Sequence, residues 1–154
     1  MKLIISTESN QKFSIALADS RRLIDYVLVE KPFMQSELVL QIIDKLFNKY
    51  KITNNYKLLQ INDSKRIITN NYKLLDEIIV ISGPGDFSAV RIGISIANAL
   101  SYAWSVPVKA VKLKKKYKSE ESKLKDVLKL SAKVNAGKIA EPVYNAEPNI
   151  TTRQ

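Results

Sequence analysis

The chain has 154 residues, a formal net charge of +10 at pH 7, no cysteine and no histidine. Without these two residue types it forms no disulfide and offers no thiolate or imidazole, which excludes zinc hydrolysis and serine-histidine catalysis. The length suits one domain, 1–154, and no apolar run is long enough for a signal peptide or a membrane span. We therefore expect a cytoplasmic protein without cofactor, metal or membrane contact.

Apolar runs and their periodicity predict five strands and three helices. The strands are Leu3–Ile5, Phe13–Leu17, Leu23–Val29, Ile78–Ser82 and Val108–Val111, and the helices are Ser36–Tyr50, Ser88–Ser105 and Glu120–Asn135. The first three strands can pair as antiparallel neighbours, whereas the next two need right-handed crossovers through helices. This order, βββαβαβα, predicts an α/β fold with a mixed five-stranded sheet, as in a ribonuclease H-like core.

A tandem duplication interrupts the periodicity after the first helix. The sequence ITNNYKLL at 52–59 returns unchanged at 68–75. Two copies are too few for a solenoid, and a surface loop accepts added length at small entropic cost. We interpret about 51–76 as a duplicated insert in a surface connection and assign it no activity.

The most informative stretch is the junction between the fourth strand and the second helix, Ser82–Ser88. Glycines on both sides of Pro84 predict a tight turn that another backbone can approach closely, and Asp86 or Ser88 is expected to cap the helix. Such a junction can also hold an anion. However, Ser88 stands where a dinucleotide fingerprint has its third glycine, and no lysine follows as in a P-loop. We interpret the turn as a structural helix start or as a way to present the helix to a partner.

The helices at 36–50 and 88–105 carry more apolar surface than one sheet can cover. Their apolar positions span arcs of about 200° and 220°, whereas roughly 100° suffices to cover a sheet. Because monomers rarely leave large apolar patches in water, we predict a helix-to-helix interface with another subunit. The alternative is that insert and tail cover the surplus. The predicted interface residues are Val39, Ile42, Ile43, Leu46, Val90, Ile94, Ala97 and Ser101, and the small residues Ala89, Gly93 and Ala97 are expected to let another helix come close.

Most of the positive charge lies in the basic helix and tail at about 112–154. Between Lys109 and Lys138 there are eleven lysines against Glu120, Glu121 and Asp126. A solvated basic face explains this pattern, and contact with tRNA phosphates is the alternative. The residues proposed for that contact are Lys114, Lys115, Lys116 and Lys118.

Residues 79–93, IVISGPGDFSAVRIG, closely resemble the signature of the TsaB (YeaZ) family. The segment 35–46 resembles that family's first helix, with Gln35 where a histidine is usual, and 105–108 resembles its next strand entry. The likeness covers residues 1 to about 113 and extends weakly to Glu141–Tyr144. The signature residues are Gly83, Pro84, Gly85, Asp86, Phe87, Ser88, Arg91 and Gly93.

The resemblance implies a non-catalytic subunit of the machinery that places threonylcarbamoyl on the adenosine next to the tRNA anticodon. It implies the actin-like ATPase superfamily, a TsaD-like catalytic subunit as partner and a TsaE-like ATPase in the same complex. TsaB-like proteins use the helices that match 36–50 and 88–105 to pair with TsaD or with themselves, so a homodimer is a further expectation.

The sequence also departs from the family. Ser6 stands where the first strand usually ends in aspartate, and Leu113 and Tyr117 stand where TsaD relatives have two metal-binding histidines. Neither residue is a useful metal ligand. Between Val111 and Glu141 there is room only for a basic loop and one helix, where relatives have a second lobe. We therefore expect a minimal, non-catalytic form.

Three functions remain open from the sequence. A scaffold that binds a TsaD-like subunit is the first, and a stand-alone tRNA-binding module is the second. The third is a metal-dependent nucleotide hydrolase or ribonuclease H-like nuclease, which would need several carboxylates around metal ions and which Ser6 opposes.

Overall fold

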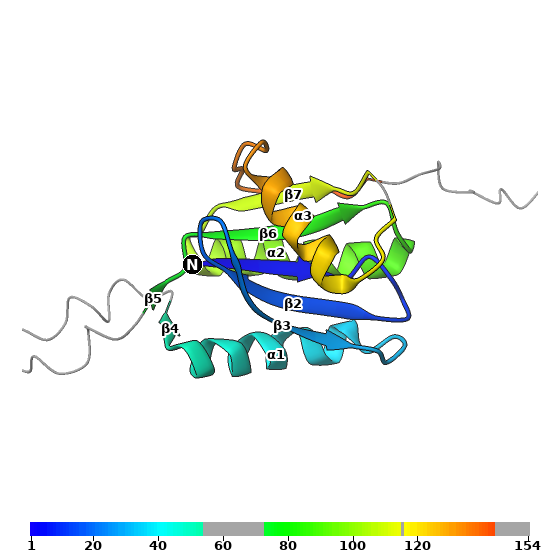
Figure 1. Ribbon diagram of the computed structural model, residues 1–154, viewed down its shortest axis with the longest axis horizontal. Helices are drawn as coiled ribbons and strands as arrows, with labels where there is room; N and C mark the ends of the chain where they lie inside the picture. The colour runs from blue at the N-terminus through cyan, green and yellow to red at the C-terminus, as the bar shows by residue number, and fades with distance from the viewer. Residues whose placement is uncertain (54–72, 115, 144–154) are drawn as a thin grey trace, which may run out of the picture.

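A mixed sheet of five strands forms the centre of the molecule, in the order β3-β2-β1-β6-β7 (Figure 1). The structure, a computed structural model, describes residues 1–53, 73–114 and 116–143. β1 pairs antiparallel with β2, which pairs antiparallel with β3, and β6 lies parallel between β1 and β7. The strands are β1 (Lys2–Ser6), β2 (Phe13–Ala18), β3 (Leu23–Val29), β6 (Glu77–Gly83) and β7 (Val108–Lys112).

Helices cover both faces of this sheet, which explains the nearly continuous apolar runs of the central strands. On one face α1 (Gln35–Tyr50) and α2 (Phe87–Trp104) pack on side chains such as Leu3, Ile78 and Val80. On the other face α3 (Glu120–Ser131) packs on the alternate residues, such as Ile4 and Ile79. Figure 1 shows α3 crossing the sheet on the side opposite α2.

The predicted order of the main elements is confirmed, with two differences. Two short strands, β4 (Ile52–Thr53) and β5 (Lys73–Leu74), form a separate parallel pair that was not predicted. They hold the two ends of the duplicated insert together, and the rest of that insert, 54–72, lies outside the described residues. α3 ends at Ser131 rather than near Asn135, because the next amides, of Lys133 and Val134, bond back to Leu130 and Ser131 as a tight turn.

The boundaries of the helices follow ordinary capping rules only in part. Ser119 caps α3, since its hydroxyl oxygen accepts from the amide of Ser122 at 3.2 Å. α1 begins at Gln35, one residue before the predicted Ser36, and has no side-chain cap. None of the helices that the structure describes is long and apolar enough to cross a membrane.

Candidate functional site

The signature turn is a joint at which three parts of the chain meet. Gly83 has a φ of 125°, which favours glycine, and a side chain there would collide with the carbonyl oxygen of Val143. The amide of Val143 donates to the Ser82 carbonyl at 2.7 Å, and the Leu113 amide donates to the Gly83 carbonyl at 2.8 Å. The segment 141–143, here called the closing segment, therefore runs beside the turn and supports it.

The end of β1 approaches the same joint from the other side. The Asp86 amide donates to the Glu8 carbonyl at 2.9 Å, and a side chain at Gly85 would collide with that carbonyl. On α2, a side chain at Gly93 would collide with Oγ1 of Thr7, whose hydroxyl donates to the Ala89 carbonyl at 2.9 Å. Gly93, together with Ala89 one turn before it, thus admits the end of the chain's own β1, which corrects the expectation that these two residues admit another helix.

Asp86 and Ser88 do not cap α2 as predicted. Although Asp86 occupies the N-cap position, its carboxylate accepts from the Asn10 amide at 2.7 Å, and the Ser88 hydroxyl donates to Asn10 Oδ1 at 3.1 Å. Both side chains therefore hold the β1–β2 loop. Phe87 is exposed and lies beneath the guanidinium of Arg91, 4.0 Å from the ring centre.

Gln35, where relatives have histidine, supports the same loop. Its side chain is buried, and Nε2 donates to the Ser9 carbonyl at 2.6 Å. The side chains of Asp86, Ser88 and Gln35 thus all hold the β1–β2 loop against the signature turn.

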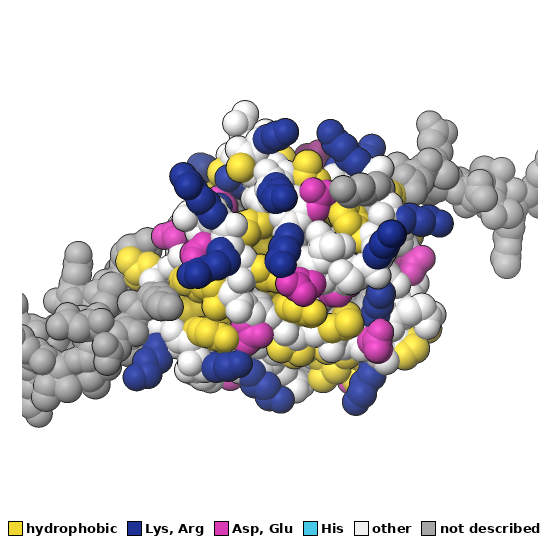
Figure 2. Space-filling model, in the orientation of Figure 1, with side chains coloured by type: hydrophobic (Ala, Val, Ile, Leu, Met, Phe, Trp, Pro, Cys, Tyr) yellow, Lys and Arg dark blue, Asp and Glu magenta, His cyan; other side chains and the backbone are white. Residues whose placement is uncertain are grey.

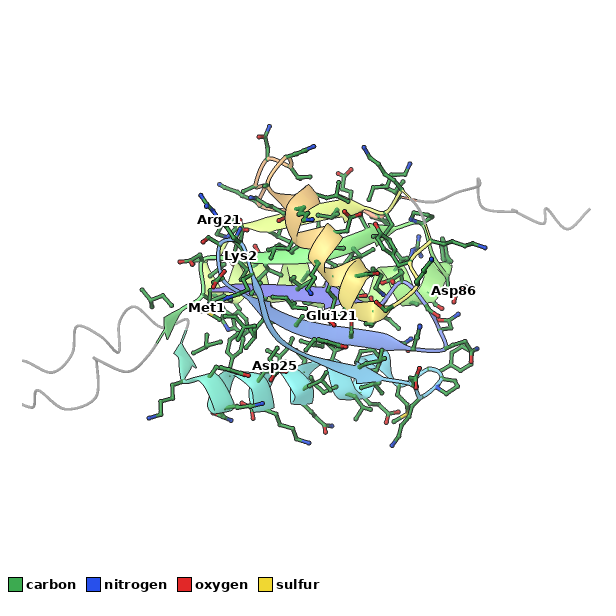
Figure 3. The ribbon with its side chains drawn as sticks, viewed as in Figure 1. Met1, Lys2, Arg21, Asp25, Asp86 and Glu121 are labelled. Atoms are coloured by element: carbon green, nitrogen blue, oxygen red, sulfur yellow. The ribbon has the colours of Figure 1, made fainter. Side chains whose placement is uncertain are left out.

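An open groove of about 950 Å³, here called the end groove, lies beside this joint. It is bounded by the β1–β2 loop, the signature turn, residues 113–114 and 116–119, and the first turn of α3. Figure 3 shows Asp86 at this end of the sheet and Lys2 at the opposite end. The carboxyl ends of β1 and β6 point towards the groove, which is where ligands usually bind in open α/β sheets.

A buried cluster of charges forms the floor of the end groove. The Lys123 ammonium lies 2.5 Å from Oε1 of Glu8 and 2.7 Å from Oε1 of Glu120. The hydroxyl of Ser6 donates to Glu8 at 2.9 Å, and that of Ser14 donates to Glu120 at 2.5 Å. These side chains come from β1 and the loop after it, from β2 and from α3, so the cluster joins both layers of the fold.

In this cluster two carboxylates share one lysine, and both also receive hydroxyl hydrogen bonds. Among the described residues, no group of three or more acidic side chains is arranged to hold a metal ion.

Leu113 and Tyr117, which the resemblance places at about the positions of metal-binding histidines in TsaD relatives, also line the end groove. Leu113 is buried, and the Tyr117 hydroxyl donates to Asp126 at 2.6 Å. Burial together with this hydrogen bond raises the pKa of Tyr117 to about 12, so its phenol stays neutral at physiological pH.

The eight predicted interface residues belong to the chain's own core, which corrects their assignment to a partner surface. Each is at most 8 % exposed, because α1 and α2 turn these side chains towards the sheet and towards each other. They are Val39, Ile42, Ile43, Leu46, Val90, Ile94, Ala97 and Ser101.

Surplus apolar surface nevertheless exists on both helices, beside the residues that face the core. α1 and α2 lie side by side, with the rings of Phe47 and Trp104 5.4 Å apart. Leu40 is 51 % exposed, and residues at successive turns of α2 are half-buried or exposed. This surface, here called the helix seam, consists of Leu40, Phe47, Ile92, Ile96, Ala99, Leu100, Ala103 and Trp104.

The proposed tRNA-contacting lysines lie on the rim of the end groove. Lys114, Lys116 and Lys118 are exposed and line it, whereas Lys115 lies outside the described residues. The closing segment is described as far as Val143.

The central segment of the chain matches a known family. Residues 67–113 match the sequence model "TsaD: tRNA N6-adenosine threonylcarbamoyltransferase". The match includes β6, the signature turn, α2 and β7, which together form the joint and one side of the helix seam. A comparison with curated proteins gave no match.

Solved structures share the fold. "YeaZ from Pseudomonas aeruginosa" superposes with a TM-score of 0.55 and 22% sequence identity, over 72% of this chain and 43% of that chain. A second structure, an uncharacterized protein with similarity to peptidase YeaZ from Pseudomonas aeruginosa, gives a TM-score of 0.55 and 22% identity over 72% and 42%. This chain therefore spans less than half the length of these two proteins. It is YeaZ-like in its ribonuclease H-like, actin-like fold, with a TsaD-related segment at its centre.

Proposed function

We propose that this chain is a non-catalytic scaffold subunit in tRNA threonylcarbamoyladenosine modification, and that it binds a TsaD-like catalytic subunit through the helix seam. The observation that carries the proposal is the seam itself, an apolar strip along two adjacent helices that the described chain leaves partly in contact with water. Burying such a strip is the main driving force for association between subunits.

The relation of residues 67–113 to TsaD supports a partner of the same fold. A TsaD-like protein would present its own version of α2, so the two seams would pack as neighbouring helices with small residues where they cross. In this chain Ala99 and Ala103 are exposed on the seam one turn apart, which lets a partner helix approach closely. A TsaE-like ATPase would be a further member of the complex, and a homodimer through the same seam would compete with it.

The non-catalytic role is supported by the floor of the end groove. A hydrolase or nuclease would need several carboxylates that are free to bind metal ions, whereas Glu8 and Glu120 are both ion-paired with Lys123. The hydrolase alternative therefore has the weaker support.

Charge placed in the seam tests the proposal. Ile92→Asp and Ala99→Asp put a carboxylate on half-buried and exposed seam positions that the isolated fold does not need. An unpaired carboxylate in an apolar interface costs about 2–3 kcal/mol, so we expect the Kd for the host's TsaD-like protein to rise roughly 30- to 100-fold. Co-purification of the co-expressed pair and titration by calorimetry measure this effect.

Gln41→Asp is the matched control, because Gln41 is exposed on the side of α1 that faces β3, away from the seam. It should leave binding unchanged, and all three variants should keep the circular dichroism spectrum and Tm of the parent. If both seam variants bind the TsaD-like protein with wild-type affinity, the proposed interface is refuted. It is also refuted if the variants lose only their self-association.

A further inference from the structure

A second interaction surface lies on the opposite face of the sheet, around α3. In the described part of 112–138 there are nine lysines and three acidic residues. Lys123 and Lys125 have carboxylate partners, in Glu8, Glu120 and Glu121. The other seven are exposed and form no ion pair within the described residues; we call them the lysine face: Lys112, Lys114, Lys116, Lys118, Lys129, Lys133 and Lys138.

The acidic residues of this region do not balance the lysine face. Glu120 is buried against Lys123, Glu121 pairs with Lys125 at 2.5 Å, and Asp126 accepts from the Tyr117 hydroxyl. Because these carboxylates are already engaged, the exposed ammonium groups create a positive field that extends into solvent. Figure 2 shows Lys and Arg side chains spread over this side of the molecule, where α3 lies.

The lysine face has two parts that a single polyanion could reach together. Lys114, Lys116 and Lys118 line one side of the end groove, and Lys12, also exposed, lines the other. The carboxylates that line the groove do not cancel these charges. Lys123 compensates one of the two charges of Glu8 and Glu120, and Asp86 accepts from the neutral Asn10 amide, so five lysines against three carboxylates leave the lining with a net charge of +2. Lys129, in the last turn of α3, and Lys133, in the turn that follows the helix, continue the basic surface.

We propose that the lysine face binds the phosphate backbone of an RNA, and that this RNA is the tRNA on which the complex acts. The tRNA identity rests on the proposed function, whereas the polyanion chemistry rests on the charges alone. Lysine is a point charge on a flexible stem, which suits phosphate contacts that position a nucleic acid but do not read its bases. Because α3 and the helix seam lie on opposite faces of the sheet, this chain can hold RNA and its protein partner together.

Fluorescence anisotropy with labelled tRNA transcript and the full chain alone tests the inference. We expect the doubly reversed variants Lys129→Glu with Lys133→Glu, and Lys116→Glu with Lys118→Glu, each to weaken binding at least tenfold at low salt. The slope of log K against log salt concentration should fall by about one for each phosphate that the variant no longer neutralises. The matched control, Lys31→Glu with Lys45→Glu, makes the same charge change at exposed positions beside α1 and should change affinity at most about twofold.

Equal weakening by the control would show that only net charge matters and would overturn the inference. Lysine-dependent binding to vesicles of anionic lipid without binding to tRNA would overturn it as well. The proposed function fails separately, because Ile92→Asp should keep full tRNA affinity. If tRNA binding depends on the lysines but the chain does not bind a TsaD-like protein, the scaffold role is refuted and the lysine face stands.

Discussion

At the scale of single residues, Lys123 is the group on which the end groove depends. Its ammonium is the cation for two carboxylates, Glu8 and Glu120, and all three side chains are largely buried. Removing one partner of a buried ion pair leaves uncompensated charge, which costs about 3–5 kcal/mol. We therefore expect Lys123→Met to lower the free energy of unfolding by that amount, as measured by urea denaturation at pH 7.

Lys125→Met is the control for this prediction. Lys125 lies close to Lys123 in the same helix and pairs with Glu121 at 2.5 Å, but both side chains of this pair are more than half exposed. Exposed pairs of this spacing contribute about 0.3–0.5 kcal/mol. Similar destabilisation by the two variants would contradict the view that the cluster on the groove floor is a buried network.

Individual contacts were the part of the site that the sequence predicted least well. Ser14 and Glu120, which share a hydrogen bond, are separated by 106 positions, and no local pattern connects them. The assignment of residues to the interface failed for a related reason. An apolar arc shows how wide a helix's apolar surface is, but its centre faces the chain's own sheet, so a partner can reach only its flank.

At the scale of elements, the junction of β1 with α2 is the most tightly packed feature of the signature. A methyl group at position 93 would collide with Oγ1 of Thr7, which is fixed by its hydrogen bond to the Ala89 carbonyl. Overpacking of this kind costs about 1–3 kcal/mol, more than the roughly 1 kcal/mol that alanine gains over glycine within a helix. We expect Gly93→Ala to lower both Tm and the free energy of unfolding.

Two further variants identify the cause. Gly137→Ala adds the same methyl group where the nearest atom would lie 3.5 Å away, and it should change stability little. In a Thr7→Ala background the penalty of Gly93→Ala should shrink, because the colliding oxygen is gone, and a double-mutant cycle measures this coupling. An unchanged penalty in that background would show that Thr7 is not the obstacle.

The elements themselves were largely predictable because their signals are local. Alternation and continuous apolar runs located the five main strands, and caps or proline located most helix ends. The pair β4 and β5 was missed, because two-residue strands such as Ile52–Thr53 carry no periodic pattern. The prediction extended α3 beyond its actual end, because Gly137, the next residue that favours a break, lies six positions beyond Ser131.

At the scale of the whole molecule, the two ends of the sheet have different charge arrangements. At the end groove, one lysine joins two glutamates; at the opposite end, Glu77 joins two lysines. The Glu77 carboxylate lies 2.6 Å from the Lys2 ammonium and 2.9 Å from that of Lys109. Glu77 and Lys2 are the first residues of β6 and β1, and Lys109 is the second residue of β7. The cluster therefore links the three parallel strands at the end where Figure 3 places Lys2.

The ion-paired cluster of Glu77, Lys2 and Lys109 makes the fold sensitive to acid. Burial by itself would raise the pKa of Glu77, but the hydrogen bonds from Lys2 and Lys109 outweigh it and lower the pKa below its ordinary value of 4.5. A carboxyl whose pKa is lower in the folded state contributes stability above its unfolded pKa and loses it as the pH falls through the folded pKa.

Glu77→Gln should therefore be less stable than the parent at pH 7 and lose less stability between pH 5 and pH 3. Urea midpoints across this range measure both effects, with the exposed Glu121→Gln as control. If the parent and Glu77→Gln lose stability equally on acidification, the acid sensitivity arises at other carboxylates.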